Sequence, residues 1–324
     1  MDTVSWGILS TAKIGVEKVI PAIQQADNCI VKGIASRSKG KANIAAQKLS
    51  IPKAYGSYKK LLADPSIDAI YNPLPNHLHV LKTVEALEAG KHVLCEKPIA
   101  LNSQEAKKLV QKVNEYPNLK VMEAFMYRFH PQWKKAKSLI SEREIGTLKT
   151  VDSFFSYYND DPDNIRNNSD MGGGGLMDIG CYCISLSRFL FDEEPVNLSG
   201  YWKIDPAFNI DYLASGTIEF NSGTATFTCA TQTTPHQQIT IIGTGGKIII
   251  DIPFNAPPNQ TTSIWLFKNG QKKEITFPSV NQYTLQAKAF SDAVINNEPV
   301  PTPLTDAVNN MIAIDAFRER AKNS

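Results

Sequence analysis

Short apolar segments alternate with helical patterns over the first 122 residues, and few folds accept such a sequence. We predict buried strands at residues 4–9, 30–35, 68–71, 92–95 and 119–122, separated by stretches with helical spacing. Strands that alternate with helices through short turns form a parallel sheet. The N-terminal part is therefore predicted to be a doubly wound α/β domain.

Helix ends in this part are predicted from capping residues. Ser38, Asn76 and Ser103 are expected to begin helices, because their side chains can accept hydrogen bonds from free backbone N–H groups. Gly90 is expected to end a helix, and Pro21 to kink one or to start a second segment.

The pattern changes after Gly146. A glycine run at residues 172–175 precedes one predicted helix at 176–191, and turn sequences at 221–223, 243–246 and 269–270 then separate successive strands. This succession predicts a C-terminal α+β domain with a large, open, mostly antiparallel sheet, closed by helices near 285–294 and 304–320. We place the two domains at residues 1–123 and 124–324.

The composition excludes several classes of protein. A length of 324 residues suits two domains, and 34 Lys and Arg against 32 Asp and Glu give no basic surplus for nucleic acid. No apolar run approaches the ~20 residues of a membrane helix, and the first residues lack a secretory pattern. Five scattered cysteines without a C-x-x-C pair predict reduced thiols. We expect a cytoplasmic protein without a membrane or nucleic-acid partner and without a metal.

Small residues follow the first predicted strand in a G-x-G-x-x-G frame, with Ser and Ala at the first two glycine positions. The frame is occupied by Ser10, Thr11, Ala12, Lys13, Ile14 and Gly15. Backbone N–H groups in such a turn bind a pyrophosphate at the start of a helix, as in Rossmann domains. Half-matched turns are common, but the position between the first strand and the first helix favours cofactor binding by residues 10–14.

The end of the second predicted strand indicates which dinucleotide is bound. Where an acidic residue would hold the ribose hydroxyls of NAD, the chain has Ser36, Arg37 and Ser38. An arginine with flanking hydroxyls attracts a 2′-phosphate, so the sequence favours NADP, with NAD as the alternative. Arg37 could instead be a solvated loop residue, and Lys41 could assist or be solvated.

Two later strand ends carry further candidates. After strand 68–71, the cofactor-binding candidates are Pro73, Leu74, Asn76, His77 and His79. Ligands bind at the carboxyl edge of open α/β sheets, so these residues could contact a nicotinamide ring or a substrate. His79 could equally be buried and bonded to backbone. No third ligand lies near the two histidines, so we predict no metal site.

Glu96 and Lys97 end the next strand at the same predicted edge. A lysine held between a buried strand and Pro98 could bind a substrate oxygen and lower the pKa of a neighbouring acid. A lysine exposed to solvent would fit this short segment equally well.

Asp178 and Tyr182 are four residues apart after the glycine run, so on a helix they share one face. A carboxylate and a phenol, together with a lysine from the first domain, can support proton removal from an alcohol. The alternative is an Asp that is stabilised by the helix dipole beside a Tyr that only packs.

These segments together resemble the glucose–fructose oxidoreductase / inositol dehydrogenase / MocA family over nearly the whole chain. The resemblance lies in the Ser-Thr-Ala turn, residues 75–79, residues 89–98 and residues 172–182. It implies a Rossmann domain followed by an α/β domain whose sheet supports dimers or tetramers. It also implies that Lys97 and Tyr182 are catalytic and that Asp178 positions the substrate. Inositol enzymes have His at the position of Tyr182, and with Tyr there the chain resembles the branch of dihydrodiol and aldose dehydrogenases.

The resemblance implies an NAD(P)-dependent oxidoreductase that transfers a hydride between NADP and a sugar or cyclic polyol, most specifically an aldose 1-dehydrogenase. Candidate substrate-binding residues are Tyr127, Arg128, His130 and Arg166, each of which could instead be structural. A trans-dihydrodiol dehydrogenase and a catalytically silent NADP-binding regulator are the alternatives.

Overall fold

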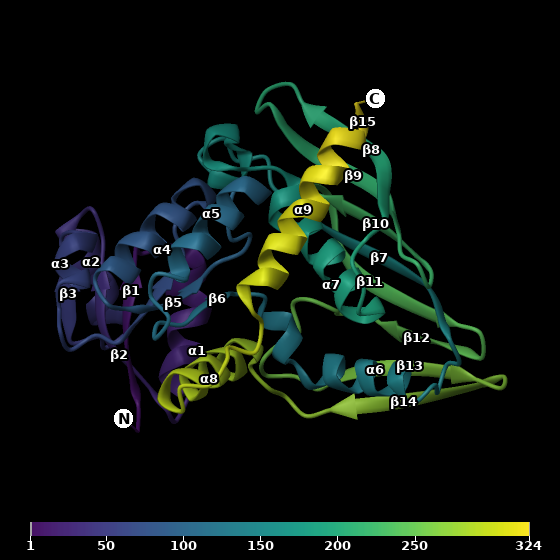
Figure 1. Ribbon diagram of the computed structural model, residues 1–324, viewed down its shortest axis with the longest axis horizontal. Coiled ribbons are helices and arrows are strands. Elements are labelled where there is room, and N and C mark those ends of the chain that lie inside the picture. The colour runs from purple at the N-terminus through teal and green to yellow at the C-terminus, as the bar shows by residue number, and fades with distance from the viewer. Residues whose placement is uncertain (1, 324) are drawn as a thin grey trace. The chain divides into compact units, whose positions relative to one another are not determined.

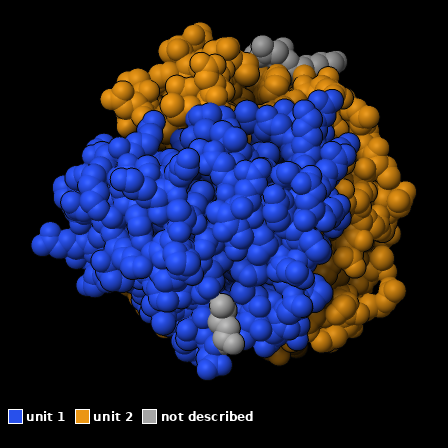
Figure 2. Space-filling model, turned by 60° about the vertical axis from the view of Figure 1, so that its left-hand side comes forward, with its two compact units in different colours: residues 1–126, 282–308 blue, residues 127–281, 309–324 orange. Residues whose placement is uncertain are grey.

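The computed structural model describes residues 2–323, which form two compact units (Figure 2). The first unit comprises the residues up to Met126 together with Gln282–Val308, and the second comprises Tyr127–Asn281 together with the residues from Asn309 onward. These units do not test whether the predicted domains, 1–123 and 124–324, fold independently, so those domains remain a prediction. The units differ from them mainly in placing Gln282–Val308 with the first sheet.

The first unit contains a six-stranded parallel sheet, which confirms the predicted doubly wound architecture (Figure 1). Its strands are β1 (Val4–Leu9), β2 (Cys29–Ala35), β3 (Lys53–Tyr55), β4 (Ala69–Asn72), β5 (His92–Cys95) and β6 (Val121–Glu123). They lie in the order β3-β2-β1-β4-β5-β6, so the order reverses between β1 and β4. Ligands of open parallel sheets bind at the carboxyl ends of the strands beside such a reversal.

The helices of this unit connect the strands. They are a π-helical turn η1 (Gly15–Val19), α1 (Ile20–Gln25), α2 (Lys39–Lys48), α3 (Tyr58–Leu62), a 3₁₀ turn η2 (Asn76–Leu78), α4 (His79–Glu88), α5 (Ser103–Val113) and α8 (Gln282–Ile295). Pro21 lies in the first turn of α1, so it starts a second segment as predicted.

Two of the three predicted helix caps are wrong. The Ser38 hydroxyl does cap α2 by accepting from the Lys41 N–H. Asn102, not Ser103, caps α5, with its side chain accepting from the Glu105 N–H at 2.9 Å. Asn76 opens the 3₁₀ turn before α4, and no side chain caps α4. The cap of α5 is displaced by one residue because Asn102 and Ser103 are adjacent and have similar cap propensities. Asn76 does not cap α4 because the 3₁₀ turn Asn76–Leu78 precedes that helix.

Helix α8 packs on the first sheet although it comes late in the chain. The Phe290 ring lies 5.4 Å from that of the buried Trp6, and the Asn28 side chain donates to Asp292 at 2.8 Å. The Cys29 thiol and the Ser291 hydroxyl are 3.1 Å apart in the same interface. A buried aromatic pair and these polar contacts explain why α8 belongs to the first unit.

The second unit is built on a nine-stranded, mostly antiparallel sheet, as predicted. Its order is β14-β13-β12-β11-β7-β10-β9-β8-β15, and its pairs β7–β10 and β8–β15 are parallel. The strands are β7 (Leu148–Tyr158), β8 (Asn197–Asp205), β9 (Ile210–Glu219), β10 (Thr224–Ala230), β11 (Gln232–Gly243), β12 (Gly246–Ile250), β13 (Thr262–Lys268), β14 (Gln271–Phe277) and β15 (Lys322–Asn323).

Figure 1 shows α6 (Pro131–Ser141), α7 (Cys181–Phe191) and α9 (Leu304–Arg320) on one side of this sheet. The turns η3 (Met126–Phe129), η4 (Ile165–Asn167), η5 (Ser169–Met171) and η6 (Leu176–Gly180) complete the helical segments. Phe317 of α9 packs 5.2 Å from Phe227, over Gly200 and Gly216, where an added Cβ would clash with the Phe317 ring. The other side of the sheet exposes Tyr201 and Ile242.

Candidate active site

The first βα turn has the backbone that a dinucleotide fold needs, although it lacks two glycines. Ser10 adopts φ 75°, the left-handed conformation that favours glycine, and its hydroxyl accepts from the Ala12 N–H at 3.2 Å. Ser10, Thr11 and Ala12 are half-buried at the carboxyl end of β1, Lys13 is exposed, and Ile14 leads into η1. The serine hydroxyl thus helps to hold the tight turn that the first glycine would otherwise allow.

The segment after β2 presents positive charge. Ser36 is buried, and its hydroxyl accepts from the Ser38 N–H at 3.2 Å. Arg37, Ser38 and Lys41 are exposed. Burial raises the pKa of Tyr58, and the charge of Arg37 and its hydrogen bond to Tyr58 act in the opposite direction. The two serine hydroxyls shape the turn, and Arg37 is the cation that it presents.

The two candidate histidines after β4 differ in their exposure to solvent. His77 is exposed and Asn76 is half-buried, whereas Pro73 and Leu74 are buried. His79 is only 1% exposed, and its ring nitrogens lie 2.7 Å from the carbonyl oxygens of Leu74 and Pro98. Burial lowers the pKa of His79 to about 4. His79 is therefore a buried, backbone-bonded residue, the alternative that the sequence left open.

Lys97 lies in the segment after β5, at the same edge of the sheet. Lys97 and Glu96 are half-buried, and the Tyr71 hydroxyl donates to Glu96 at 2.6 Å. The sheet order places the ends of β2, β1, β4 and β5 side by side. The turn at residues 10–14, Arg37, the segment 73–77 and Lys97 therefore share one edge of the first unit.

In the second unit, Asp178 is the acceptor of a polar cluster. It lies in η6 and is 9% exposed. One of its oxygens, Oδ2, accepts from the Tyr157 hydroxyl at 2.5 Å and from Arg166 Nε at 2.9 Å. Burial and the Asp178 charge raise the pKa of Tyr157, while Asp178 raises the pKa of Arg166. Arg166 and Asp178 come together as candidates, and the sequence analysis missed Tyr157.

Tyr182, one turn later at the start of α7, is surrounded by aromatic rings. Its ring centroid lies 5.9 Å from Tyr127, 5.8 Å from Phe155 and 5.4 Å from Phe254, and it is 6% exposed. Phe254 follows β12 and lies 72 residues from Tyr182, which is why no local pattern pointed to it. The phenol ring is thus held in one orientation by packing.

The remaining substrate candidates have structural partners. The hydroxyl of buried Tyr127 lies 2.9 Å from that of Ser185, and Arg128 Nη2 donates to the same Ser185 oxygen at 2.8 Å. His130 is buried and caps α6, its Nδ1 accepting from the Gln132 N–H at 3.2 Å. Burial lowers the pKa of His130 to about 4. These contacts hold the segment before α6 against α7.

The glycine run surrounds a buried carboxylate that the sequence did not reveal. Asp211 of β9 is buried, and its Oδ2 accepts from the Leu176 N–H at 2.5 Å, at the start of η6. Gly174 has φ 114°, and an added Cβ would lie 2.2 Å from Asp211 Oδ1. Glycine is needed here because no other side chain leaves room for this carboxylate.

The described residues contain no cluster of three or more His, Cys, Asp and Glu side chains arranged to hold a metal ion. All five cysteines are buried and unpaired by disulfides. Across residues 2–323, no helix combines the length and the apolar character needed to cross a membrane.

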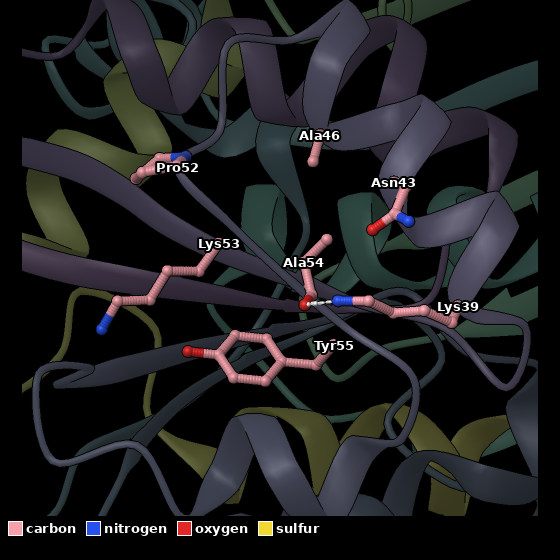
Figure 3. Close-up of a pocket in the computed structure, with 7 residues that line it drawn as sticks. All are labelled: Lys39, Asn43, Ala46, Pro52, Lys53, Ala54 and Tyr55. Atoms are coloured by element: carbon pink, nitrogen blue, oxygen red, sulfur yellow. Dashed lines mark hydrogen bonds between the residues drawn. The ribbon is translucent and has the colours of Figure 1, made fainter.

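A pocket of about 510 Å³ lies between α2 and β3 (Figure 3). Its lining residues are Lys39, Asn43, Ala46, Pro52, Lys53, Ala54 and Tyr55. Lys39 points across it to the Ala54 carbonyl, and Lys53 pairs with Asp64 at 2.7 Å. None of the candidate residues lines this pocket.

Replacing Asp211 by Asn should change how stability depends on pH. Burial raises the pKa of Asp211 from its ordinary 3.8 to about 7, with Arg318 acting in the opposite direction. Between about pH 4 and pH 7 the folded state holds a proton that the unfolded state lacks, so Asp211 makes the free energy of unfolding fall as pH rises. Relative to wild type, Asp211→Asn should gain about 1.4 kcal/mol per pH unit across this window. Urea unfolding measures the difference.

The matched control is Asp152→Asn, at an exposed aspartate of the same sheet. It should keep the wild-type slope. Parallel slopes for Asp211→Asn and wild type would contradict a raised pKa for Asp211.

Comparison with known proteins identifies the family of the chain. A model described as the oxidoreductase family with an NAD-binding Rossmann fold matches residues 4–125, and one for the GFO/IDH/MocA C-terminal domain matches residues 133–249. The chain is 37% identical to a D-xylose 1-dehydrogenase (NADP(+)) of Haloferax volcanii over 98% of this chain and 97% of that one. It is 31% identical to a trans-1,2-dihydrobenzene-1,2-diol dehydrogenase of Xenopus tropicalis, over 84% and 81% of the two chains.

Among solved structures, a 3-ketoreductase of Actinomadura kijaniata in complex with NADP and TDP-benzene is similar, with a TM-score of 0.92 and 25% identity. The match covers 99% of this chain and 98% of that one. The family predicted from residues 89–98 and 172–182 is confirmed. The chain belongs to the GFO/IDH/MocA family of oxidoreductases with an NAD-binding Rossmann fold.

Proposed function

We propose that the protein is an NADP-dependent dehydrogenase that oxidises a hydroxyl group of a sugar or cyclic polyol, most specifically the anomeric hydroxyl of an aldose. The observation that carries the proposal is the similarity to a D-xylose 1-dehydrogenase (NADP(+)) along nearly the full length of both chains. The half-buried Lys97 and the Asp178 cluster supply groups suited to this chemistry.

The edge of the first sheet fits a dinucleotide. The left-handed Ser10 turn would place backbone N–H groups of residues 10–14 at a pyrophosphate, and Arg37 would hold a 2′-phosphate. Pro73, Leu74, Asn76, His77, Glu96 and Lys97 lie in the segments that would border the nicotinamide half. NADP supplies the hydride acceptor when it is bound.

The chain's own residues would move the proton. Tyr182 would take the proton of the substrate hydroxyl, and the Lys97 ammonium would stabilise the negative charge that develops on its oxygen. Asp178 would orient the sugar by accepting hydrogen bonds from its hydroxyls. Tyr157 and Arg166 fix the position of the Asp178 carboxylate, because both donate to its Oδ2.

A trans-dihydrodiol dehydrogenase is the second candidate function. The aromatic rings of Tyr127, Phe155 and Phe254 around Tyr182 would suit a flat apolar substrate, and a relative of that activity is 31% identical. A panel of aldoses, polyols and dihydrodiols, monitored for NADPH formation, separates the two functions. Tight NADP binding without turnover of any of them would instead favour a silent regulator.

Lys97→Met should abolish turnover and leave NADP affinity nearly unchanged. The methionine keeps the length of the side chain but removes its charge, so kcat should fall by at least about 100-fold. Steady-state kinetics and fluorescence titration of NADPH measure the two effects. Lys107→Met, which removes an exposed lysine of α5, is the control and should keep wild-type turnover. Retained activity in Lys97→Met would refute the catalytic assignment.

Arg37→Ala should weaken NADP binding far more than NAD binding. Loss of one charge-assisted contact to a 2′-phosphate should raise the Michaelis constant for NADP by about 10-fold. Lys48→Ala removes the same charge at the far end of α2 and should change neither constant. Equal effects of Arg37→Ala on both cofactors would show that Arg37 does not read the phosphate.

We also propose that copies of the chain associate, as a dimer or tetramer, through the outer face of the nine-stranded sheet. Tyr201 and Ile242 expose 56% and 37% of their surface there, and Trp265 and Phe267 are half-exposed on the same face. Light scattering should give a multiple of 35.8 kDa for the wild type and a lower mass for Ile242→Asp. Ile44→Asp, on α2, is the matched control and should keep the wild-type mass. A 35.8 kDa wild type would exclude the assembly.

A further inference from the structure

Two buried ionisable side chains hold the Pro98–Ile99 peptide group, which begins one residue after Lys97. The Pro98 carbonyl oxygen lies 2.7 Å from His79 Nδ1, and the Ile99 N–H donates to Glu123 Oε1 at 2.7 Å. This carbonyl and this N–H belong to the same peptide group. His79 is 1% exposed and Glu123 is 2% exposed. With the proton of the neutral His79 ring on Nδ1, both polar atoms of this peptide are hydrogen bonded to side chains in the protein interior.

The two side chains come from opposite sides of β5. His79 is the first residue of α4, which follows β4, and Glu123 is the last residue of β6. The second His79 nitrogen lies 2.7 Å from the Leu74 carbonyl, so the ring also connects the segment after β4 to the segment after β5. The Ala124 N–H donates to the Cys95 carbonyl at 2.8 Å and keeps the end of β6 beside β5.

Burying two ionisable side chains costs free energy, so their retention here needs an explanation. Removing a carboxylate and an imidazole from water is unfavourable unless both are hydrogen bonded. Burial lowers the pKa of His79, the Lys97 and His77 charges act in the same direction, and its two carbonyl contacts oppose them. An apolar core would pack here without these groups, but it would leave the Pro98–Ile99 peptide unbonded. The bonded peptide begins one residue after Lys97.

We propose that His79 and Glu123 are positioning residues that fix Lys97 by clamping the Pro98–Ile99 peptide from both sides. The effect on turnover rests on the proposed function, whereas the clamp itself does not. A small displacement of a charged group that must lie beside a reacting oxygen lowers the rate strongly, because its alignment is lost.

The clamp is tested in the cofactor-free protein by hydrogen exchange, followed by mass spectrometry of the peptide that contains Ile99. Glu123→Ala removes the acceptor and should speed exchange of the Ile99 amide. Glu123→Gln keeps a side-chain oxygen and should preserve its protection. His92→Gln is the control, because His92 accepts from the Lys120 N–H at the opposite end of β5. Unchanged exchange in Glu123→Ala would overturn the clamp.

Activity tests the consequence. In Glu123→Ala, kcat should fall by about 10- to 100-fold while the Kd for NADP changes little, and Glu123→Gln should recover most of the rate. His79→Leu, which removes the other partner of the peptide, should lower kcat in the same way. His92→Gln should lower the melting temperature without lowering kcat. Should Glu123→Ala fail to fold, Glu123→Asp, which is one methylene shorter, gives the same two measurements.

The outcomes separate the clamp from the proposed function. Faster exchange with unchanged kcat would overturn the positioning role. A wild type that turns over no sugar, polyol or diol, or a fully active Lys97→Met, would overturn the proposed function and leave the exchange result standing.

Discussion

Hydrogen bonds between buried side chains and backbone groups at the carboxyl edge of the parallel sheet hold the segments that carry the candidate residues of the first unit. Strands β4 and β5 end beside each other, and the segments after them carry the residues proposed to border the cofactor. Beyond Glu96, whose N–H still donates to the Asn72 carbonyl of β4, side chains bond to buried backbone groups of these segments. The neutral His79 ring lies between the Leu74 and Pro98 carbonyls and donates its one N–H to one of them, and Glu123 accepts from the Ile99 N–H. Their bonds keep the edge rigid around Lys97.

In the second unit, a side chain likewise bonds to a buried backbone group, here at the start of a helical segment. The N–H of Leu176 is buried, and Asp211 of β9 accepts from it. Gly174 is therefore a steric requirement of this carboxylate, because an added Cβ would lie 2.2 Å from Asp211 Oδ1. With the start of the helix fixed, Asp178 is held by Tyr157 and Arg166 and Tyr182 is held by aromatic packing. Each candidate side chain depends on partners that lie far from it in sequence.

This dependence explains what could be predicted from the sequence. Strand–helix alternation, the turn at Ser10 and the mostly antiparallel second sheet follow from local patterns, and the structure agrees with them. Tyr157, Asp211 and Phe254 could not be found in that way, because they reach Asp178, Leu176 and Tyr182 across 21, 35 and 72 residues. The cap of α5 was misplaced by one residue for a different reason, since Asn102 and Ser103 are adjacent and both accept hydrogen bonds readily.

His79 shows how one sequence pattern can support two roles. A histidine just after a strand end points to the edge where ligands bind, and on that basis it was a cofactor candidate. Its position as the first residue of α4 turns the ring inward, between two carbonyl oxygens. A ligand-contacting side chain must remain accessible, whereas a side chain that holds the ligand-contacting segment must be buried and bonded. His77 is exposed and meets the first requirement, whereas His79, two residues later, is buried and meets the second.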